Sequence, residues 1–64
     1  MEDEMLDKTA EWANVIINFI VADLQVAKID IMSNDAAARK AGVYLIKDAS
    51  ALMAKLTDLT NLLD

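Results

Sequence analysis

The residues that could do chemistry in this 64-residue chain are mostly carboxylates, because histidine and cysteine are absent. Eleven Asp and Glu stand against six Lys and Arg, which gives a net charge of −5 at pH 7. Without His and Cys the chain lacks the usual proton shuttle, the commonest metal ligands and any disulfide. Ser33 and Ser50 have no His to activate them as nucleophiles, and a single glycine excludes a glycine-rich phosphate loop. The sequence therefore predicts a non-enzymatic protein without a cofactor or a metal.

Asp23 is the acidic residue whose position most needs an explanation. At about 100° per helical residue it falls within an apolar arc, between Ile16, Phe19, Ile20 and Ala27. A carboxylate that is buried without a partner has a raised pKa. One interpretation is structural, namely an ion pair that sets the register of an oligomer or an edge position that reaches water. The other is functional, namely contact with a ligand or with a basic residue of a partner. We favour the structural interpretation.

A second candidate site is a small basic patch formed by Arg39, Lys40 and Tyr44. A nucleotide base could stack on Tyr44 while Arg39 binds its phosphate. The same residues also fit an exposed helix face, and we favour that interpretation. The three residues are kept as a candidate ligand patch.

Two long helices are predicted to position these residues. Proline is absent, and a hydrophobic content of 56% is too high for a disordered chain. The first helix is expected over about residues 3–32 and the second over about residues 36–63. Between them, Ser33, Asn34 and Asp35 are all good N-cap residues. A connection this short makes the helices antiparallel neighbours. The prediction is an all-α chain with one domain, residues 1–64, folded as an antiparallel two-helix hairpin.

The second helix carries an unbroken heptad pattern of apolar and small residues, typical of a helix–helix seam. Gly42 lies within this pattern, where glycine costs roughly 1 kcal/mol relative to Ala, so its presence indicates close packing. The predicted seam comprises Ala38, Gly42, Leu45, Ala49, Leu52, Leu56, Leu59 and Leu63.

The first helix has a wider apolar arc than one such seam can cover, which predicts association with another chain. Two hairpins packed face to face would form a four-helix bundle, so we expect a homodimer or a larger helical oligomer. Acidic residues at the open end and basic residues near the turn favour a dimer with its turns at opposite ends. The predicted oligomer interface comprises Trp12, Ile16, Phe19, Ile20, Asp23 and Ala27.

Charge and hydropathy disfavour other partners. The acidic balance disfavours direct binding of nucleic acid. The apolar run of the first helix is interrupted by Asn14 and Asn18 and ends at Asp23, which disfavours a membrane span of about 20 apolar residues. The acidic start, where a secretory signal would be basic, indicates that no leader is cleaved, and the lack of cysteine fits the cytoplasm.

In length, central turn and antiparallel arms the chain resembles small plasmid and phage hairpin proteins that dimerise into four-helix bundles. The resemblance lies in the architecture, and no functional residue is carried over from it. The leading hypothesis is a small homo-oligomeric helical protein that binds another protein. One alternative is a small acidic inhibitor of the phage type, which would mimic nucleic acid or sequester a small anionic nucleotide signal. Another alternative is an assembly chaperone or a subunit of a larger helical complex.

Overall fold

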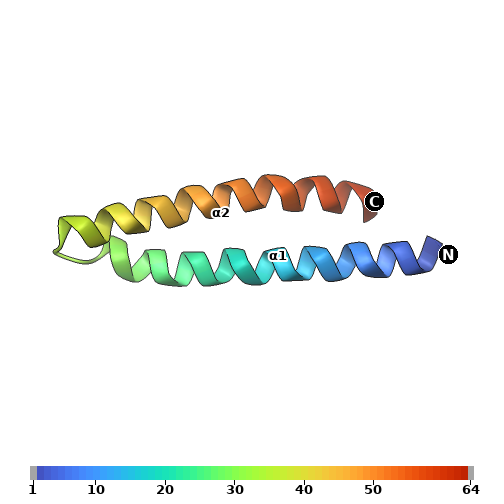
Figure 1. Cartoon of the computed structure of the whole chain (residues 1–64), viewed down its shortest axis with the longest axis horizontal. Helices are drawn as coiled ribbons and strands as arrows, with labels where there is room; N and C mark the ends of the chain where they lie inside the picture. Colours follow the sequence, from blue (N-terminus) through green and yellow to red (C-terminus); the bar gives the residue numbers. More distant parts are fainter. Residues whose placement is uncertain (1, 64) are drawn as a thin grey trace.

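The computed structural model describes residues 2–63, and it describes side chains for residues 4–63. Helix α1 spans Glu2–Ile31 and helix α2 spans Ala36–Leu63. The two helices run antiparallel, so the start of α1 and the end of α2 lie at the same end of a rod of 52 × 14 × 12 Å (Figure 1). The prediction of an all-helical chain with two helices packed against each other is confirmed. The side chains of Glu2 and Asp3, two residues of the acidic start of the sequence, lie outside the described residues.

Asp35 caps the start of α2. Its carboxylate Oδ1 accepts a hydrogen bond of 3.1 Å from the backbone N–H of Ala37, as expected of an N-cap residue. Its own N–H donates to the hydroxyl of Ser33 at 3.1 Å, and the Ser33 N–H donates to the carbonyl of Asp30 at 3.1 Å. These bonds involve Ser33 and Asp35, two of the four residues between the helices, of which three are polar.

The two helices meet along matching heptad patterns. In α2 the least exposed residues are Gly42 and Ala49, with a half-buried row that repeats at the same spacing of four and three residues. That row is made of Ala38, Leu45, Leu52, Leu56 and Leu59, while Leu63 at the end of the helix is exposed. In α1 the covered residues have the same spacing, and they are Thr9, Ala13, Ile16, Ile20, Asp23, Ala27 and Asp30. Such spacing is typical of helices that pack side by side over their full length.

Gly42 brings the helices together near the turn. A Cβ atom added at this position would lie 3.0 Å from Asp30 Cβ, 3.0 Å from Ile31 Cγ1 and 3.2 Å from the Ile31 backbone nitrogen. Two of these atoms belong to the backbone of α1 or are attached directly to it, so they cannot rotate away. The close approach explains why a residue that disfavours helix occurs inside α2 near the turn.

The core of the single hairpin is thin. Its buried hydrophobic residues are Ala13, Ile20, Ala27 and Ala49, and among the described residues no large side chain is fully buried. The chain exposes 5148 Å², whereas a compact monomer of its 7.0 kDa mass would expose about 4,000 Å². Within the described residues, neither helix is long and apolar enough to cross a membrane.

Candidate interaction surfaces

One side of the hairpin carries an apolar surface to which both helices contribute. Because the helices are antiparallel, the residues that directly follow the seam residues in each helix point to the same side. The large apolar residues among them are each 39–50% exposed. We call this surface the aliphatic face, and it comprises Ile17, Val21, Leu24 and Ile31 of α1 with Val43, Ile46 and Met53 of α2.

Two hydroxyl groups on the α2 part of this side already have hydrogen-bond partners. Thr57 Oγ1 donates to the carbonyl of Met53 at 3.0 Å, and Thr60 Oγ1 donates to the carbonyl of Thr57 at 2.9 Å. A hydroxyl that is bonded within its own helix can be covered at little cost, because no donor is left unpaired. The aliphatic face can therefore extend over these residues when it is covered by another chain.

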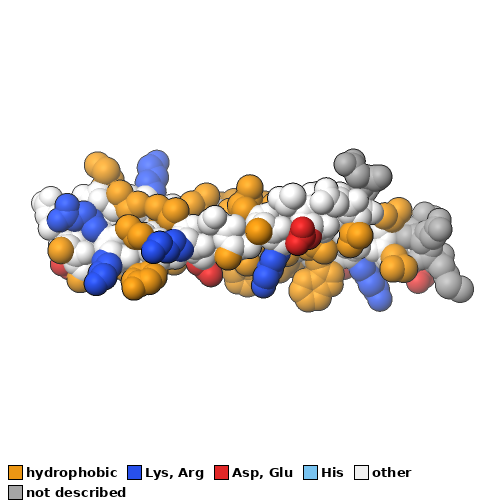
Figure 2. All heavy atoms as spheres, turned by 90° about the horizontal axis from the view of Figure 1, so that it is seen from above, with side chains coloured by type: hydrophobic (Ala, Val, Ile, Leu, Met, Phe, Trp, Pro, Cys, Tyr) orange, Lys and Arg blue, Asp and Glu red, His pale blue; other side chains and the backbone are white. Residues whose placement is uncertain are grey.

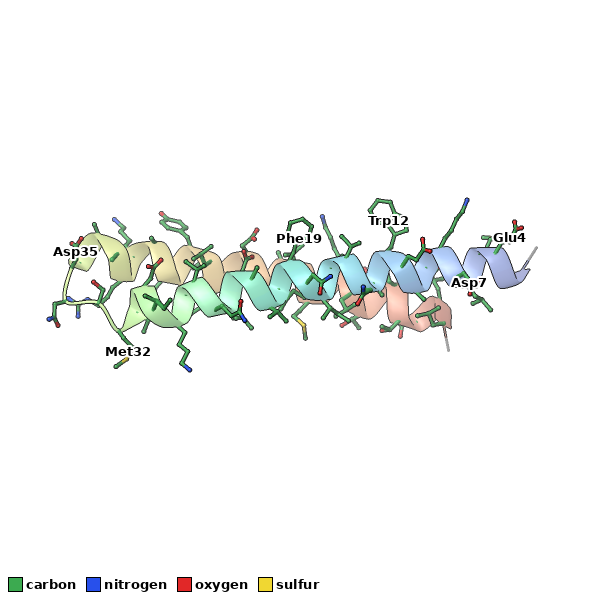
Figure 3. All side chains as sticks on the ribbon, turned by 90° about the horizontal axis from the view of Figure 1, so that it is seen from below. Glu4, Asp7, Trp12, Phe19, Met32 and Asp35 are labelled. Atoms are coloured by element: carbon green, nitrogen blue, oxygen red, sulfur yellow. The ribbon has the colours of Figure 1, made fainter. Side chains whose placement is uncertain are left out.

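The opposite side of the hairpin carries a second heptad seam, on α1 only. The residues that directly precede the covered residues of α1 are spaced by three and four, and all of them are exposed. Trp12 is 63% exposed and Phe19 is 60% exposed, and both project from the same edge of α1 (Figure 3). We call this surface the aromatic seam, and it comprises Trp12, Val15, Phe19, Ala22, Val26 and Ile29. The neighbouring α2 residues on this side include the exposed Asp48 and Lys55.

A shallow hollow lies in the middle of the aromatic seam, lined by Val15, Asn18, Phe19 and Ala22. These positions have the spacing i, i+3, i+4 and i+7. Four residues with that spacing form the hole that receives one side chain of a facing helix in knobs-into-holes packing. The surface thus has both the repeat and the local shape of a helix-docking site.

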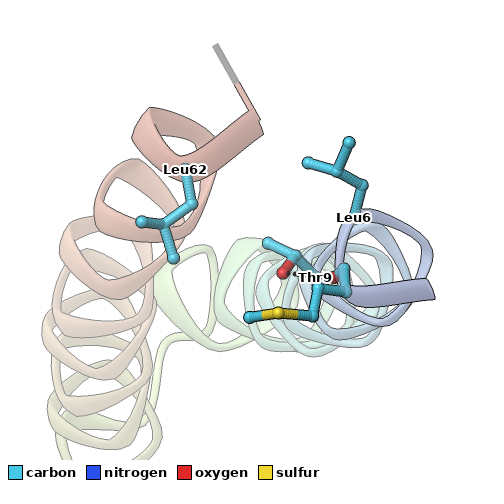
Figure 4. Close-up of a pocket in the computed structure, with 4 residues that line it drawn as sticks. Leu6, Thr9 and Leu62 are labelled. Carbon is cyan, nitrogen blue, oxygen red and sulfur yellow. Dashed lines mark hydrogen bonds between the residues drawn. The ribbon is translucent and has the colours of Figure 1, made fainter. Parts of the chain in front are cut away.

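A second hollow lies at the open end of the hairpin, where Leu62 of α2 faces Met5, Leu6 and Thr9 of α1 (Figure 4). The hydroxyl of Thr9 is bonded to the carbonyl of Met5 at 2.8 Å and leaves no free donor in the hollow. The lining is therefore mainly apolar. The hollow is present because these side chains do not fill the space between the two helix ends.

Asp23 faces a second carboxylate across the helix–helix seam. The Asp48 side chain raises the pKa of Asp23 above its ordinary value, mainly because it can hydrogen bond to the protonated carboxyl. Removal of Asp23 from water and repulsion by the Asp48 charge act in the same direction. Asp23 Oδ2 is buried and lacks a hydrogen-bond partner among the described residues. The sequence singled out Asp23 and did not identify Asp48 as its neighbour.

The candidate ligand patch is exposed. Arg39, Lys40 and Tyr44 are all open to solvent, and the ammonium group of Lys47 lies 5.9 Å from the centre of the Tyr44 ring. The ring thus already has a cation over it, supplied by the same helix. Figure 2 shows several blue basic side chains near the turn and orange hydrophobic side chains exposed along the molecule.

Of the residues predicted for the oligomer interface, some are covered by α2 within the single chain and others are exposed. Ile20 and Ala27 are covered by α2 within the single chain, at 7% and 2% exposure, and Ile16 and Asp23 are partly covered there. Trp12 and Phe19 belong to the aromatic seam and remain exposed. The oligomer interface itself stays a prediction, and the single chain leaves Trp12 and Phe19 available for it.

The chain matches no protein-family model, no curated protein and no solved structure.

Proposed function

We propose that this protein is a non-enzymatic helical interaction protein that works as a self-associated bundle. In this proposal two hairpins pair through the aliphatic face to form a four-helix bundle. The observation that carries the proposal is that both helices present large apolar side chains on one side of a hairpin that has almost no core of its own. Apolar residues beside a seam are the positions that four-helix bundles bury.

The exposed area supports the proposal. The hairpin exposes about 1,100 Å² more than a compact monomer of its mass would expose. A standard interface buries roughly 800 Å² on each partner, so pairing can remove most of this excess. Two-helix hairpins of this length have few other means of gaining stability, because the chain has no cysteine.

Charge supports a bundle with its turns at opposite ends. Glu4, Asp7 and Glu11 lie near the open end, whereas Arg39 and Lys40 lie beside the turn. Opposed turns place the acidic end of one hairpin beside the basic end of the other. Exposed charge pairs contribute little individually, so they favour this orientation without driving the association.

Sedimentation equilibrium of Ile46→Glu tests the proposal. Ile46 is in the middle of the α2 part of the aliphatic face, and a buried, unpaired carboxylate would oppose pairing. We expect the substitution to lower the average mass at micromolar concentration. The matched control is Ala54→Glu, which adds the same charge to an exposed position of α2 outside both surfaces, and it should leave the mass unchanged. Equal masses for both variants and the unsubstituted protein would rule the aliphatic face out.

Pairing through the aliphatic face leaves the aromatic seam on the outside of the bundle. In the proposed function this seam is the surface to which a further helix binds.

A further inference from the structure

We propose that the aromatic seam binds the aromatic seam of a second copy, with the two α1 helices antiparallel, so that the protein associates through two separate surfaces. The inference rests on the proposed function and deepens it, because it names the partner of the surface that the bundle leaves open. It is carried by the sizes of the side chains along the seam, by the hollow at its centre and by the charges at its ends.

Side-chain size is matched when the seam is paired with an antiparallel copy of itself. The symmetry axis is placed between Phe19 and Ala22. Successive layers of the contact then pair Phe19 with the copy's Ala22, Val15 with the copy's Val26, and Trp12 with the copy's Ile29. Phe19 thus meets a small residue, Trp12 meets a medium one and the two valines meet each other, which is how facing helices interdigitate without voids. A parallel pairing would instead set Trp12 against Trp12 and Ala22 against Ala22, with crowding in one layer and a void in the other.

The hollow lies where this pairing needs it. Val15, Asn18, Phe19 and Ala22 surround a space at the centre of the seam, beside the proposed symmetry axis. In this register the copy's Ala22 lies opposite the middle of the hollow, and the copy's Phe19 ring lies opposite its rim at Ala22. Because the axis relates the two copies, each supplies one ring and one hollow, as a symmetric contact requires.

The neighbouring charges limit the occupant to a single helix. On this side of the hairpin α2 presents Asp48 and Lys55, both exposed, so a partner two helices wide would have to bury them. At the ends, the antiparallel arrangement places Glu4 and Glu11 of one copy at the turn end of the other, away from that copy's own Glu4 and Glu11. A parallel arrangement would place the acidic ends together.

The test is an exchange of the two central residues. Phe19→Ala leaves a void in the central layers, and Ala22→Phe crowds them, so each should weaken association through the seam about tenfold or more. The double variant F19A/A22F restores a pair of one large and one small residue in each layer and should regain association. Both positions are exposed in the single hairpin, so neither change disturbs the contact between α1 and α2. Ala54→Phe provides the matched control for adding a ring outside the seam.

Trp12 provides the readout that separates the seam from the aliphatic face. It is the sole tryptophan of the chain and belongs to the seam. We expect its emission to shift to shorter wavelength as concentration rises, in parallel with a mass above that of a dimer. Each single variant should delay both changes to higher concentration, and the double variant should recover them.

Three outcomes would overturn the inference. A protein that dimerises while Trp12 emission stays constant pairs through the aliphatic face alone, and the proposed function then survives without this inference. Loss of association in F19A that A22F does not rescue means that the two seams do not pair in the proposed antiparallel register. A protein that remains monomeric up to millimolar concentration contradicts both the inference and the proposed function.

Discussion

At the scale of single residues, the pair Asp23 and Asp48 is the feature that departs most from an ordinary helix–helix seam. A carboxylate occupies a covered position where a hydrophobic residue would stabilise more, and a second carboxylate lies across from it. The arrangement favours the protonated form of Asp23, whose carboxyl can then hydrogen bond to Asp48. It makes the stability of the hairpin depend on pH.

We predict that mild acid stabilises the protein through Asp23. Because the pKa of Asp23 is raised by folding, the folded chain binds its proton more tightly than the unfolded chain. The resulting stabilisation is complete below the unfolded value of 3.8 and is lost as the pH rises through the folded pKa. Urea unfolding at fixed protein concentration, compared between pH 7 and pH 4, measures the effect.

Asp23→Asn isolates this contribution, since the amide can donate a hydrogen bond to Asp48 at every pH. We expect it to stabilise the protein at neutral pH and to reduce the gain on acidification. Asp7→Asn, at an exposed position of the same helix, removes the same charge and should retain the full gain. If the unsubstituted protein and Asp23→Asn respond equally to pH, the pair has no role in stability.

Gly42 gives the second prediction for a single residue. Ala is the better helix former by about 1 kcal/mol, so Gly42→Ala would stabilise an isolated helix. In the hairpin the added methyl group meets Asp30 Cβ and Ile31 at 3.0 Å, and such overpacking costs about 1–3 kcal/mol. We expect no net stabilisation and a loss of up to about 2 kcal/mol. Ala54→Gly measures the helix propensity alone, and a higher melting temperature for Gly42→Ala would show that the helices separate easily.

The sequence identified Asp23 and Gly42 as unusual, because each conflicts with the pattern around it. It could not identify Asp48 as the neighbour of Asp23, since that depends on how far one helix is shifted along the other. The close approach of Gly42 to Asp30 shows how far α2 is shifted along α1. From there, counting one heptad along each helix in opposite directions brings Asp23 next to Asp48 and Ala49.

At the scale of the elements, α1 is unusual because it carries apolar residues on three sides. One side packs on α2, one belongs to the aliphatic face and one forms the aromatic seam. The angular pattern alone shows the width of the apolar arc without showing which part α2 covers. The sequence therefore predicts Ile20 and Ala27 at an oligomer contact, and within the single chain α2 covers both. The spacing of four and three residues from Thr9 to Asp30 is the sequence signal that distinguishes the residues covered by α2 from the rest of the apolar arc.

The start of α2 provides a prediction at this scale. Asp35 accepts the Ala37 N–H, so Asp35→Ala leaves that donor without its partner and should cost about 1 kcal/mol. The loss should appear as a lower urea midpoint with an unchanged slope, because the exposed area of the unfolded chain does not change. Asn34→Ala is the control, at an exposed position of the same turn. Equal effects of the two substitutions would mean that the cap does not determine where α2 begins.

At the scale of the whole molecule, folding and association should be a single process. The hairpin buries three alanines and one isoleucine as its hydrophobic core, too little to offset the conformational entropy of two long helices. Anything that binds the folded chain alone raises its stability by mass action. A second copy has this effect, and it becomes stronger as the protein becomes more concentrated.

We therefore predict a melting temperature that rises with protein concentration. Circular dichroism from micromolar to millimolar concentration should show the rise, and at the lowest concentrations the helical signal itself should decrease. Ile46→Glu should flatten the dependence, whereas Ala54→Glu should leave it intact. A melting temperature that is constant over the full range would show that one hairpin is sufficient for stability.

The alanine-rich core also has a consequence for the lifetime of the protein. A chain without a companion would open often and expose its backbone to proteases, whose cleavage follows the population of the open form. A paired chain would be protected. Scarce chains would then be degraded before they meet, while abundant chains would persist, so turnover would set a threshold below which the protein does not accumulate.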